Sequence, residues 1–231
     1  GAERVRVELA DQPLVQAQML YTIGNVYREL RLLGQTQPLL EQSLAIRQRL
    51  LTPDDPALHA SMLDLGRVAQ LQGRFPVAES LYRQTLASRE RTLGAAHPDL
   101  AVVLNSLGGM FVTRGRFAEA ESLLTRAVAL RSSSMSAEDA DFARLLRNLG
   151  SAYLAQGRYA DAEPVFRRTL AMFERVVGAD HPDAGRTLSN LGVVYYGLKR
   201  YDDAESYYRR AETNLAKSLG EDHANIASIN I

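Results

Sequence analysis

The sequence is notable first for what it lacks. Its 231 residues include no cysteine and no tryptophan, and 27 Lys and Arg residues balance 27 Asp and Glu residues. Without cysteine the chain cannot form a disulfide framework, a thiolate metal site or a cysteine nucleophile. A net charge of zero gives no overall attraction to nucleic acid or to anionic membranes. We therefore expect no nucleic-acid partner.

Segments and motifs for membranes and catalysis are also missing. No apolar run approaches the ~20 residues of a membrane helix, and the first residues, Gly1 to Arg4, are not a signal peptide. We expect no membrane insertion and a cytoplasmic location. The sequence has no Walker-type loop, no Gly-x-Ser-x-Gly and no His-Glu-x-x-His. These absences favour a protein that is not an enzyme and needs no cofactor.

What the sequence does have is a period of 42 residues. The period is marked by Gly24, Gly66, Gly108, Gly150 and Gly192. Each glycine lies in a helical stripe such as Leu146, Leu149, Gly150 and Tyr153, spaced i, i+3, i+4, i+7. A fixed period of this size indicates a stacked-repeat architecture. Because a glycine inside a helix costs ~1 kcal/mol, we predict that the backbone of a second helix approaches each one closely.

Turn signals complete the repeating unit. Gly73, Gly115 and Gly157, each followed by Arg and an aromatic residue, predict a left-handed turn between two helices, and Lys199 is the variant. A Gly and a His-Pro loop, as at His181 and Pro182, then precede the next unit. The sequence predicts five helix pairs, at 14–30 with 35–51, 56–72 with 75–93, 98–114 with 117–133, 138–156 with 159–177, and 182–198 with 201–219.

The pattern predicts one all-α domain over residues 1–231. Its full repeats are expected at about 14–55, 56–97, 98–139, 140–181 and 182–223. Residues 3–13 resemble the end of an earlier second helix, and residues 224–231 resemble the start of a sixth first helix. Terminal repeats of a solenoid need polar capping faces, which this sequence lacks at its C-terminal end. We therefore expect the chain to be part of a longer protein.

The repeat resembles a known family. The stripe Leu-x-x-Leu-Gly-x-x-Tyr, the turn Gly-Arg-Tyr and the following Ala-Asp-Ala-Glu are similar to the tetratricopeptide repeat. The 42-residue unit and the His-Pro loop resemble the kinesin-light-chain subtype. This resemblance implies a right-handed superhelical solenoid of antiparallel helix pairs, and a scaffold that binds a peptide or partner domain in a concave groove.

A narrower resemblance covers residues 8–50. They are similar to repeats that follow the kinase domain of large bacterial serine/threonine kinases. This resemblance gives an alternative function, a regulatory or docking module that acts in cis on a fused catalytic domain. A further alternative is self-association through apolar end repeats.

In the family, the first helices line the groove. The positions two, three and six residues before each repeat glycine, and one after it, are expected to face a ligand. The candidate site residues are Tyr21, Asn25, Asp64, Arg67, Asn105, Arg144, Arg147, Asn148, Ser151, Arg186, Ser189 and Asn190. The asparagines can donate to and accept from a peptide backbone. The four arginines outnumber the one acid, Asp64, so we expect a basic groove and an acidic peptide. The alternative is that these side chains are solvated or paired with nearby acids.

The histidines give a weaker signal. His97, His181 and His223 occupy one position of the repeat, each before or near an Asp. As metal ligands they would lie a full repeat or more apart. We therefore predict that they are turn elements and expect no metal site.

Overall fold

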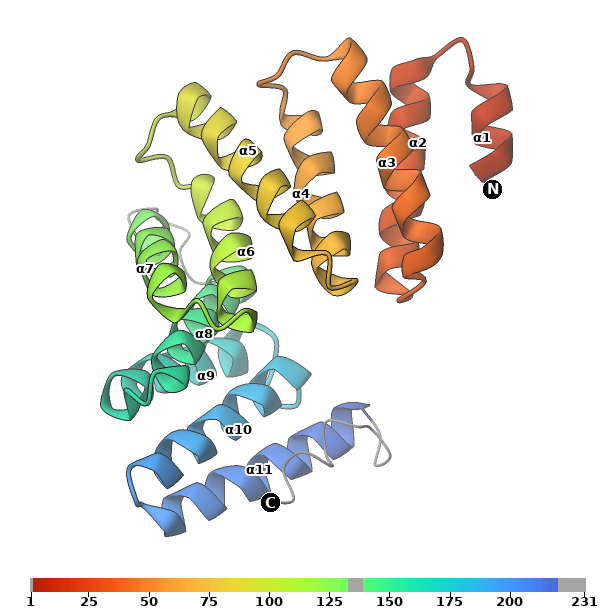
Figure 1. Cartoon of the computed structure of the whole chain (residues 1–231). Helices are drawn as coiled ribbons and strands as arrows, with labels where there is room; N and C mark the ends of the chain where they lie inside the picture. Colours follow the sequence, from red (N-terminus) through yellow and green to blue (C-terminus); the bar gives the residue numbers. More distant parts are fainter. Residues whose placement is uncertain (1, 133–138, 220–231) are drawn as a thin grey trace. The chain divides into compact units, whose positions relative to one another are not determined.

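The computed structural model describes residues 2–132 and 139–219, and within these ranges the chain forms eleven α-helices and no strand (Figure 1). The helices are α1 (Ala2–Glu8), α2 (Pro13–Glu29), α3 (Leu33–Leu50), α4 (Pro56–Leu71), α5 (Phe75–Leu93), α6 (Leu100–Thr113), α7 (Phe117–Ser132), α8 (Ala140–Ala155), α9 (Tyr159–Val176), α10 (Pro182–Gly197) and α11 (Tyr201–Leu219). The even-numbered helices from α2 to α10 are the first helices of the repeats, and the odd-numbered helices from α3 to α11 are the second helices.

The chain divides into two compact units, and the division falls within α6. Unit 1 is Gly1–Leu107 and unit 2 is Gly108–Ile231. In unit 1, α2 packs against α3 and α4 against α5. In unit 2, α8 packs against α9 and α10 against α11, and every pair is antiparallel (Figure 1). The all-α class and the helix pairing are therefore confirmed. The partial sixth repeat, 224–231, and His223 lie outside the described residues, and the single continuous domain stays a prediction.

Helix boundaries agree with the repeat pattern to within two residues. The clearest difference is at α6, which begins at Leu100, although Pro98 was expected near its first turn. His97, Pro98 and Asp99 form a turn first, in which the N–H of Leu100 donates to the carbonyl of His97 at 3.1 Å. At the equivalent loop in unit 2, α10 begins at Pro182 as predicted, because a proline at the first helical position loses no intrahelical hydrogen bond.

The repeat glycines have one packing role. In each repeat a large side chain sixteen residues further on, in the second helix, lies against the glycine. A Cβ at Gly66 would lie 2.5 Å from Cε1 of Tyr82, and one at Gly150 would lie 2.9 Å from Cε1 of Phe166. The close approach is thus confirmed, but a ring or a leucine side chain approaches the glycine, where backbone was expected.

The turns within the helix pairs are left-handed, as the glycines predicted. Gly73, Gly115 and Gly157 have φ angles of 74°, 72° and 71°. Arg31 and Lys199 occupy the same position of their repeats with φ angles of 60° and 62°. The turn is therefore kept even where a side chain makes the left-handed region unfavourable.

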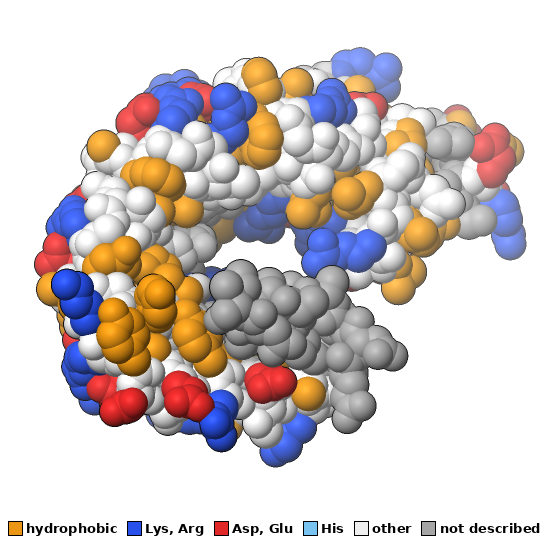
Figure 2. Space-filling view, turned by 60° about the horizontal axis from the view of Figure 1, so that its bottom comes forward, with side chains coloured by type: hydrophobic (Ala, Val, Ile, Leu, Met, Phe, Trp, Pro, Cys, Tyr) orange, Lys and Arg blue, Asp and Glu red, His pale blue; other side chains and the backbone are white. Residues whose placement is uncertain are grey.

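Each unit has its own apolar core. Leu40, Leu44 and Met62 belong to a buried cluster between α3 and α4 in unit 1, and Phe142 and Phe166 are almost fully buried in unit 2. At the turn between α10 and α11, aromatic side chains reach the surface instead, since Tyr196 is 62% and Tyr201 57% exposed. Figure 2 shows hydrophobic side chains gathered in a patch in this part of unit 2.

Candidate functional site

Asp64 of α4 is the centre of a polar cluster on the first helices of unit 1. The residue is 6% exposed, and its carboxylate accepts four hydrogen bonds. Oδ1 accepts from Nη1 of Arg28 at 2.7 Å and from Nη1 of Arg67 at 3.0 Å. Oδ2 accepts from the hydroxyl of Tyr21 at 2.5 Å and from Nδ2 of Asn25 at 3.3 Å. We call these five residues the unit 1 arginine cluster.

Asp183 of α10 has the same role in unit 2. It is 5% exposed. Oδ1 accepts from Nη1 of Arg147 at 2.6 Å and from Nη1 of Arg186 at 3.2 Å, while Oδ2 accepts from Nε of Arg144 at 3.2 Å. Arg144 also donates to Asp141 at 2.7 Å. Arg144, Arg147, Asp183 and Arg186 form the unit 2 arginine cluster.

The two clusters share one spacing. In each, an arginine 36 residues before the aspartate and another three residues after it donate to Oδ1. The residue 39 positions before the aspartate, Asn25 or Arg144, donates to Oδ2. The local sequences match as well, since both aspartates begin the tetrapeptide Asp-x-Gly-Arg. The same arrangement of side chains is therefore built twice.

The second copy is out of phase with the repeat. Asp64 and Asp183 are 119 residues apart, which is seven fewer than three repeats of 42. Asp64 lies two residues before Gly66, whereas Asp183 lies nine residues before Gly192. Seven residues are about two helical turns and a rise of ~10 Å, so the same helix face is kept at a different height.

Within each cluster the arginines are exposed to different degrees. The side chains of Arg28 and Arg147, which precede the aspartate, are each 19% exposed. The arginines that follow it, Arg67 and Arg186, are 40% and 45% exposed, and Arg144 is 41% exposed. A guanidinium has five N–H donors. The outer arginines can therefore contact solvent or a ligand while they remain bonded to the aspartate.

The electrostatics favour an ionised aspartate. Burial alone would raise the pKa of the Asp183 carboxyl, but the hydrogen bond and charge of Arg147, together with Arg144, outweigh it and hold that pKa below its ordinary value. In unit 1, burial and the bond to Asp64 raise the pKa of the Tyr21 hydroxyl. Arg28 and Arg67 face Asp64, and Arg28 also pairs with Glu29, whereas three arginines face Asp183 and Asp141. Counted with these acids, the unit 1 arginine cluster is neutral and the unit 2 arginine cluster keeps one positive charge in excess.

A further arginine lies behind the unit 1 arginine cluster. Arg47 of α3 is 3% exposed, and its guanidinium lies 4.7 Å from the centre of the Tyr21 ring. It donates to Ser61 Oγ at 2.7 Å and Gln18 Oε1 at 2.6 Å. Burial lowers the pKa of Arg47. Its cation–π contact holds the ring whose hydroxyl bonds Asp64.

The structure brings together seven of the twelve predicted site residues. The unit 1 arginine cluster contains four of them and the unit 2 arginine cluster three: Tyr21, Asn25, Asp64 and Arg67, and Arg144, Arg147 and Arg186. The other five lie outside the clusters and are half-buried: Asn105, Asn148, Ser151, Ser189 and Asn190.

Ser151 and Asn148 have contacts within unit 2. The Ser151 hydroxyl donates to the carbonyl of Arg147 in its own helix at 2.9 Å. The Asn148 amide lies beside Gly109 of α6, where a Cβ would come within 3.1 Å of Nδ2. Binding of a ligand by any of the twelve residues stays a prediction.

Two cluster residues were missed from the sequence. Arg28 and Asp183 lie four residues after and nine residues before a repeat glycine, outside the positions taken to face a ligand. The expectation of Asp64 as the one acid against four arginines is therefore wrong. Asp183 binds three of those arginines and Asp141 also pairs with Arg144, so two of the three positive charges are compensated. The recurring Asp-x-Gly-Arg tetrapeptide is the sequence signal that could have revealed it.

His97 and His181 accept hydrogen bonds in the loops that precede α6 and α10, and His181 is the N-cap residue of α10. Nδ1 of His181 accepts from the N–H of Asp183 at 3.1 Å, and Nδ1 of His97 accepts from that of Asp99 at 3.2 Å. This confirms their role as turn elements. Among residues 2–132 and 139–219, no group of three or more His, Asp or Glu side chains could hold a metal ion. None of the helices in this part of the chain is long and apolar enough to cross a membrane.

The family is shown by comparison with known repeats. The tetratricopeptide repeat model matches residues 15–91, 59–133 and 141–217, and a second model of the same repeat matches 107–173. These matches cover most of the sequence, so the chain belongs to the tetratricopeptide repeat family. Proteins with this repeat generally act in protein–protein interaction, and the repeat is typically non-catalytic. Comparison with curated proteins gives no match.

Solved structures of kinesin-light-chain-type repeats have a similar fold. The crystal structure of BtubC (BKLC) from P. vanneervenii is 22% identical, covering 94% of this chain and 87% of that one, with a TM-score of 0.76. Nearly identical TPR-like repeats from Podosopora anserina, named for the kinesin light chain, are 23% identical over 89% of this chain and 97% of that one, with a TM-score of 0.70.

A Rap protein complexed with Competence and Sporulation Factor has the same fold. It is 15% identical, covers 92% of this chain and 62% of its own length, and has a TM-score of 0.72. At these identities, all three structures show a shared fold.

Proposed function

We propose that the first helices of each unit bind an acidic peptide, with the outer arginines of that unit's cluster as the groups that contact its carboxylates. In each unit a buried aspartate fixes an exposed arginine: Asp64 holds Arg67, and Asp183 holds Arg186. This arrangement is the observation that carries the proposal. An arginine held in place loses less side-chain entropy when it binds a carboxylate.

The aspartate also limits what can bind. Because Asp64 and Asp183 neutralise part of the charge, the outer arginines attract a single ligand carboxylate less strongly than unpaired arginines would. Within one unit, a ligand with several acidic groups gains one charge-assisted bond at each outer arginine of that cluster. Arg144 adds a further exposed cation in unit 2, where its side chain is 41% exposed. We therefore expect the preference for acidic peptides to be stronger in unit 2.

The test uses a defined probe. An acetylated peptide of alternating Glu and Ala is labelled for fluorescence anisotropy, and its counterpart with Gln in place of Glu is the neutral reference. We expect the acidic peptide to bind more tightly, and its binding to weaken as ionic strength approaches 0.15 M, where the screening length is about 8 Å. Arg67→Gln/Arg186→Gln should lower its affinity roughly tenfold for each arginine lost.

Arg83→Gln/Arg209→Gln is the matched control. These arginines lie on the second helices α5 and α11, with side chains 55% and 77% exposed, and the double variant removes the same charge. Equal losses in the two double variants, or equal binding of the acidic and neutral peptides, would show that the clusters have only a structural role.

Two other functions remain hypotheses. The matches cover repeats alone, so the resemblance of residues 8–50 to kinase-associated repeats is still the basis of the in-cis alternative, which the full reading frame would decide. Self-association is decided by light scattering over a range of concentrations.

A further inference from the structure

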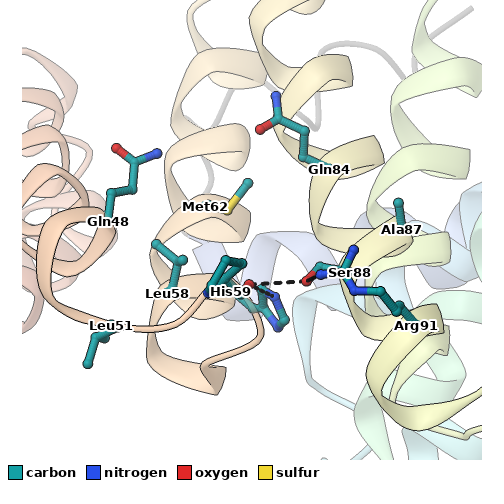
Figure 3. Close-up of a pocket in the computed structure, with 10 residues that line it drawn as sticks. Gln48, Leu51, Leu58, His59, Met62, Gln84, Ala87, Ser88 and Arg91 are labelled. Carbon is teal, nitrogen blue, oxygen red and sulfur yellow. Dashed lines mark hydrogen bonds between the residues drawn. The ribbon is translucent and has the colours of Figure 1, made fainter.

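A second candidate site lies in unit 1 between the second helices α3 and α5. It is a cavity of about 420 Å³ and contains no residue of the unit 1 arginine cluster. Leu58 and Met62 of α4 form its floor, with Leu51 and Ala87 beside them (Figure 3). Cavities of this volume with an apolar lining are typical of sites that bind small groups. We call it the α3–α5 pocket.

Hydrogen bonds hold one end of the pocket closed. The Ser88 hydroxyl donates to the carbonyl of Pro53 at 3.1 Å and to Oδ1 of Asp54 at 2.8 Å. Arg91 donates to the same oxygen of Asp54 at 2.5 Å, and Nε2 of His59 lies 3.0 Å from the Pro53 carbonyl. These polar groups bond one another. The pocket is therefore already formed, and its apolar floor is held in place.

Unit 2 has the same pocket in a different chemical form. A cavity of about 310 Å³ lies between α9 and α11. Six of its eight lining residues correspond to lining residues of the α3–α5 pocket at a separation of 126 residues, three repeats of 42. Asn214 there donates to the carbonyl of Ala179, as Ser88 does to that of Pro53. Lys217 lies 3.5 Å from Asp180, in the place of Arg91 and Asp54.

The two pockets differ at the mouth. In unit 2, Arg210 of α11 forms an ion pair with Glu174 of α9 at 3.3 Å, which joins the two helices across the opening. The corresponding residues in unit 1 are Gln84 and Gln48, one on each side of the α3–α5 pocket (Figure 3). Nε2 of Gln84 donates to Ser80 in its own helix at 2.9 Å. Unit 1 thus has two uncharged amides where unit 2 has an ion pair.

We propose that the α3–α5 pocket binds an uncharged apolar side chain of a polypeptide partner, whose backbone amides bond Gln48 and Gln84. The floor of Leu58 and Met62 disfavours a charged group, because a charge loses its hydration there and the lining cation, Arg91, is already paired with Asp54. A side-chain amide both donates and accepts, as a peptide group does. The pocket would give the protein an apolar contact separate from the first-helix face.

The probe is N-acetyl-leucinamide, a leucine side chain between two amides. The chain has five methionines, so labelling their methyl groups gives few NMR signals, and a Met62→Leu variant assigns the signal of Met62. We expect this signal to shift saturably as the probe is added. N-acetyl-aspartamide should leave it unchanged, and 3-methylbutanol, which has a similar body without amides, should bind more weakly.

Gln48→Glu/Gln84→Arg introduces the unit 2 ion pair into unit 1 and should weaken probe binding about tenfold or more. Ala87→Leu, which fills the wall of the pocket, is a second variant in case the first does not fold. Circular dichroism checks folding in both. A Met62 signal that does not saturate, equal binding of the alcohol, or unchanged binding in both variants would overturn the proposal.

Discussion

The arginine clusters of units 1 and 2 have the same bonds at different heights of the repeat. In unit 1 the aspartate lies two residues before the repeat glycine, and a tyrosine and an asparagine complete its shell. In unit 2 it lies nine residues before that glycine, and a third arginine takes their place. A helix pair can therefore hold this cluster at either of two heights. The repeat does not dictate where the charge lies.

Of the changes that test this difference between the clusters, removal of the central carboxylate should lower the free energy of unfolding most. Asp183→Asn leaves Arg144, Arg147 and Arg186 around a neutral amide, and breaking a buried ion pair costs about 3 kcal/mol or more. Asp64→Asn leaves only two arginines, so a smaller loss is expected. Urea unfolding measures both. Asp141→Asn, at a side chain that is 80% exposed, should cost less than ~1 kcal/mol. If Asp64→Asn lowers the free energy of unfolding as much as Asp183→Asn or more, the third arginine of unit 2 adds no charge repulsion.

Substitution of the glycine in each Asp-x-Gly-Arg tetrapeptide should cause the second largest loss of stability. A Cβ at Gly66 would lie 2.5 Å from the Tyr82 ring, and one at Gly185 would lie 2.2 Å from Oδ1 of Asn214. We expect Gly66→Ala and Gly185→Ala to destabilise the protein by about 1–3 kcal/mol through overpacking, despite the gain in helix propensity. Gly34→Ala has no atom within 4 Å of the new Cβ and should be neutral or slightly stabilising. If thermal unfolding shows that Gly34→Ala is destabilised as much as Gly66→Ala and Gly185→Ala, overpacking is not the cause of the loss.

Acidification should have a smaller effect on stability, and this effect should differ between the wild type and Asp183→Asn. The folded pKa of Asp183 is held below the ordinary value of 3.8. Its ionised form therefore adds stability above pH 3.8, and this contribution is lost as the pH falls through the folded pKa. We expect the difference in melting temperature between the two proteins to be constant near neutral pH and to narrow below pH 4. A difference that stays constant down to pH 3 would mean that the fold does not lower the pKa of Asp183.

Much of the fold could be predicted from the sequence, because the features that set it are local. The 42-residue period, the left-handed turn at Gly73 and the cap at His181 each depend on a few neighbouring residues, and all three are present in the structure. The site was less predictable. Tyr21 and Asp64 were both selected, but no local signal showed that they bond across 43 positions.

Asp183 shows why the rest was missed. It lies in the first turn of α10, nine residues before Gly192 and outside the repeat positions that were expected to face a ligand. Only the packing of α8 against α10 brings Arg144 and Arg147 to its carboxylate. Gln48 and Gln84 likewise lie on different helices, and only the packing of these helices places them on either side of the α3–α5 pocket.

The sequence by itself determined the helices, their turns and their order, because helix periodicity, glycine turns and proline starts act over a few residues. Tertiary structure alone decided which charges meet. Ion pairs and cavities form between helices 30 to 40 residues apart in the chain, as at Arg28 and Asp64. Their chemistry depends on which side chains face one another, and a shift of seven residues changes that while the helix remains the same.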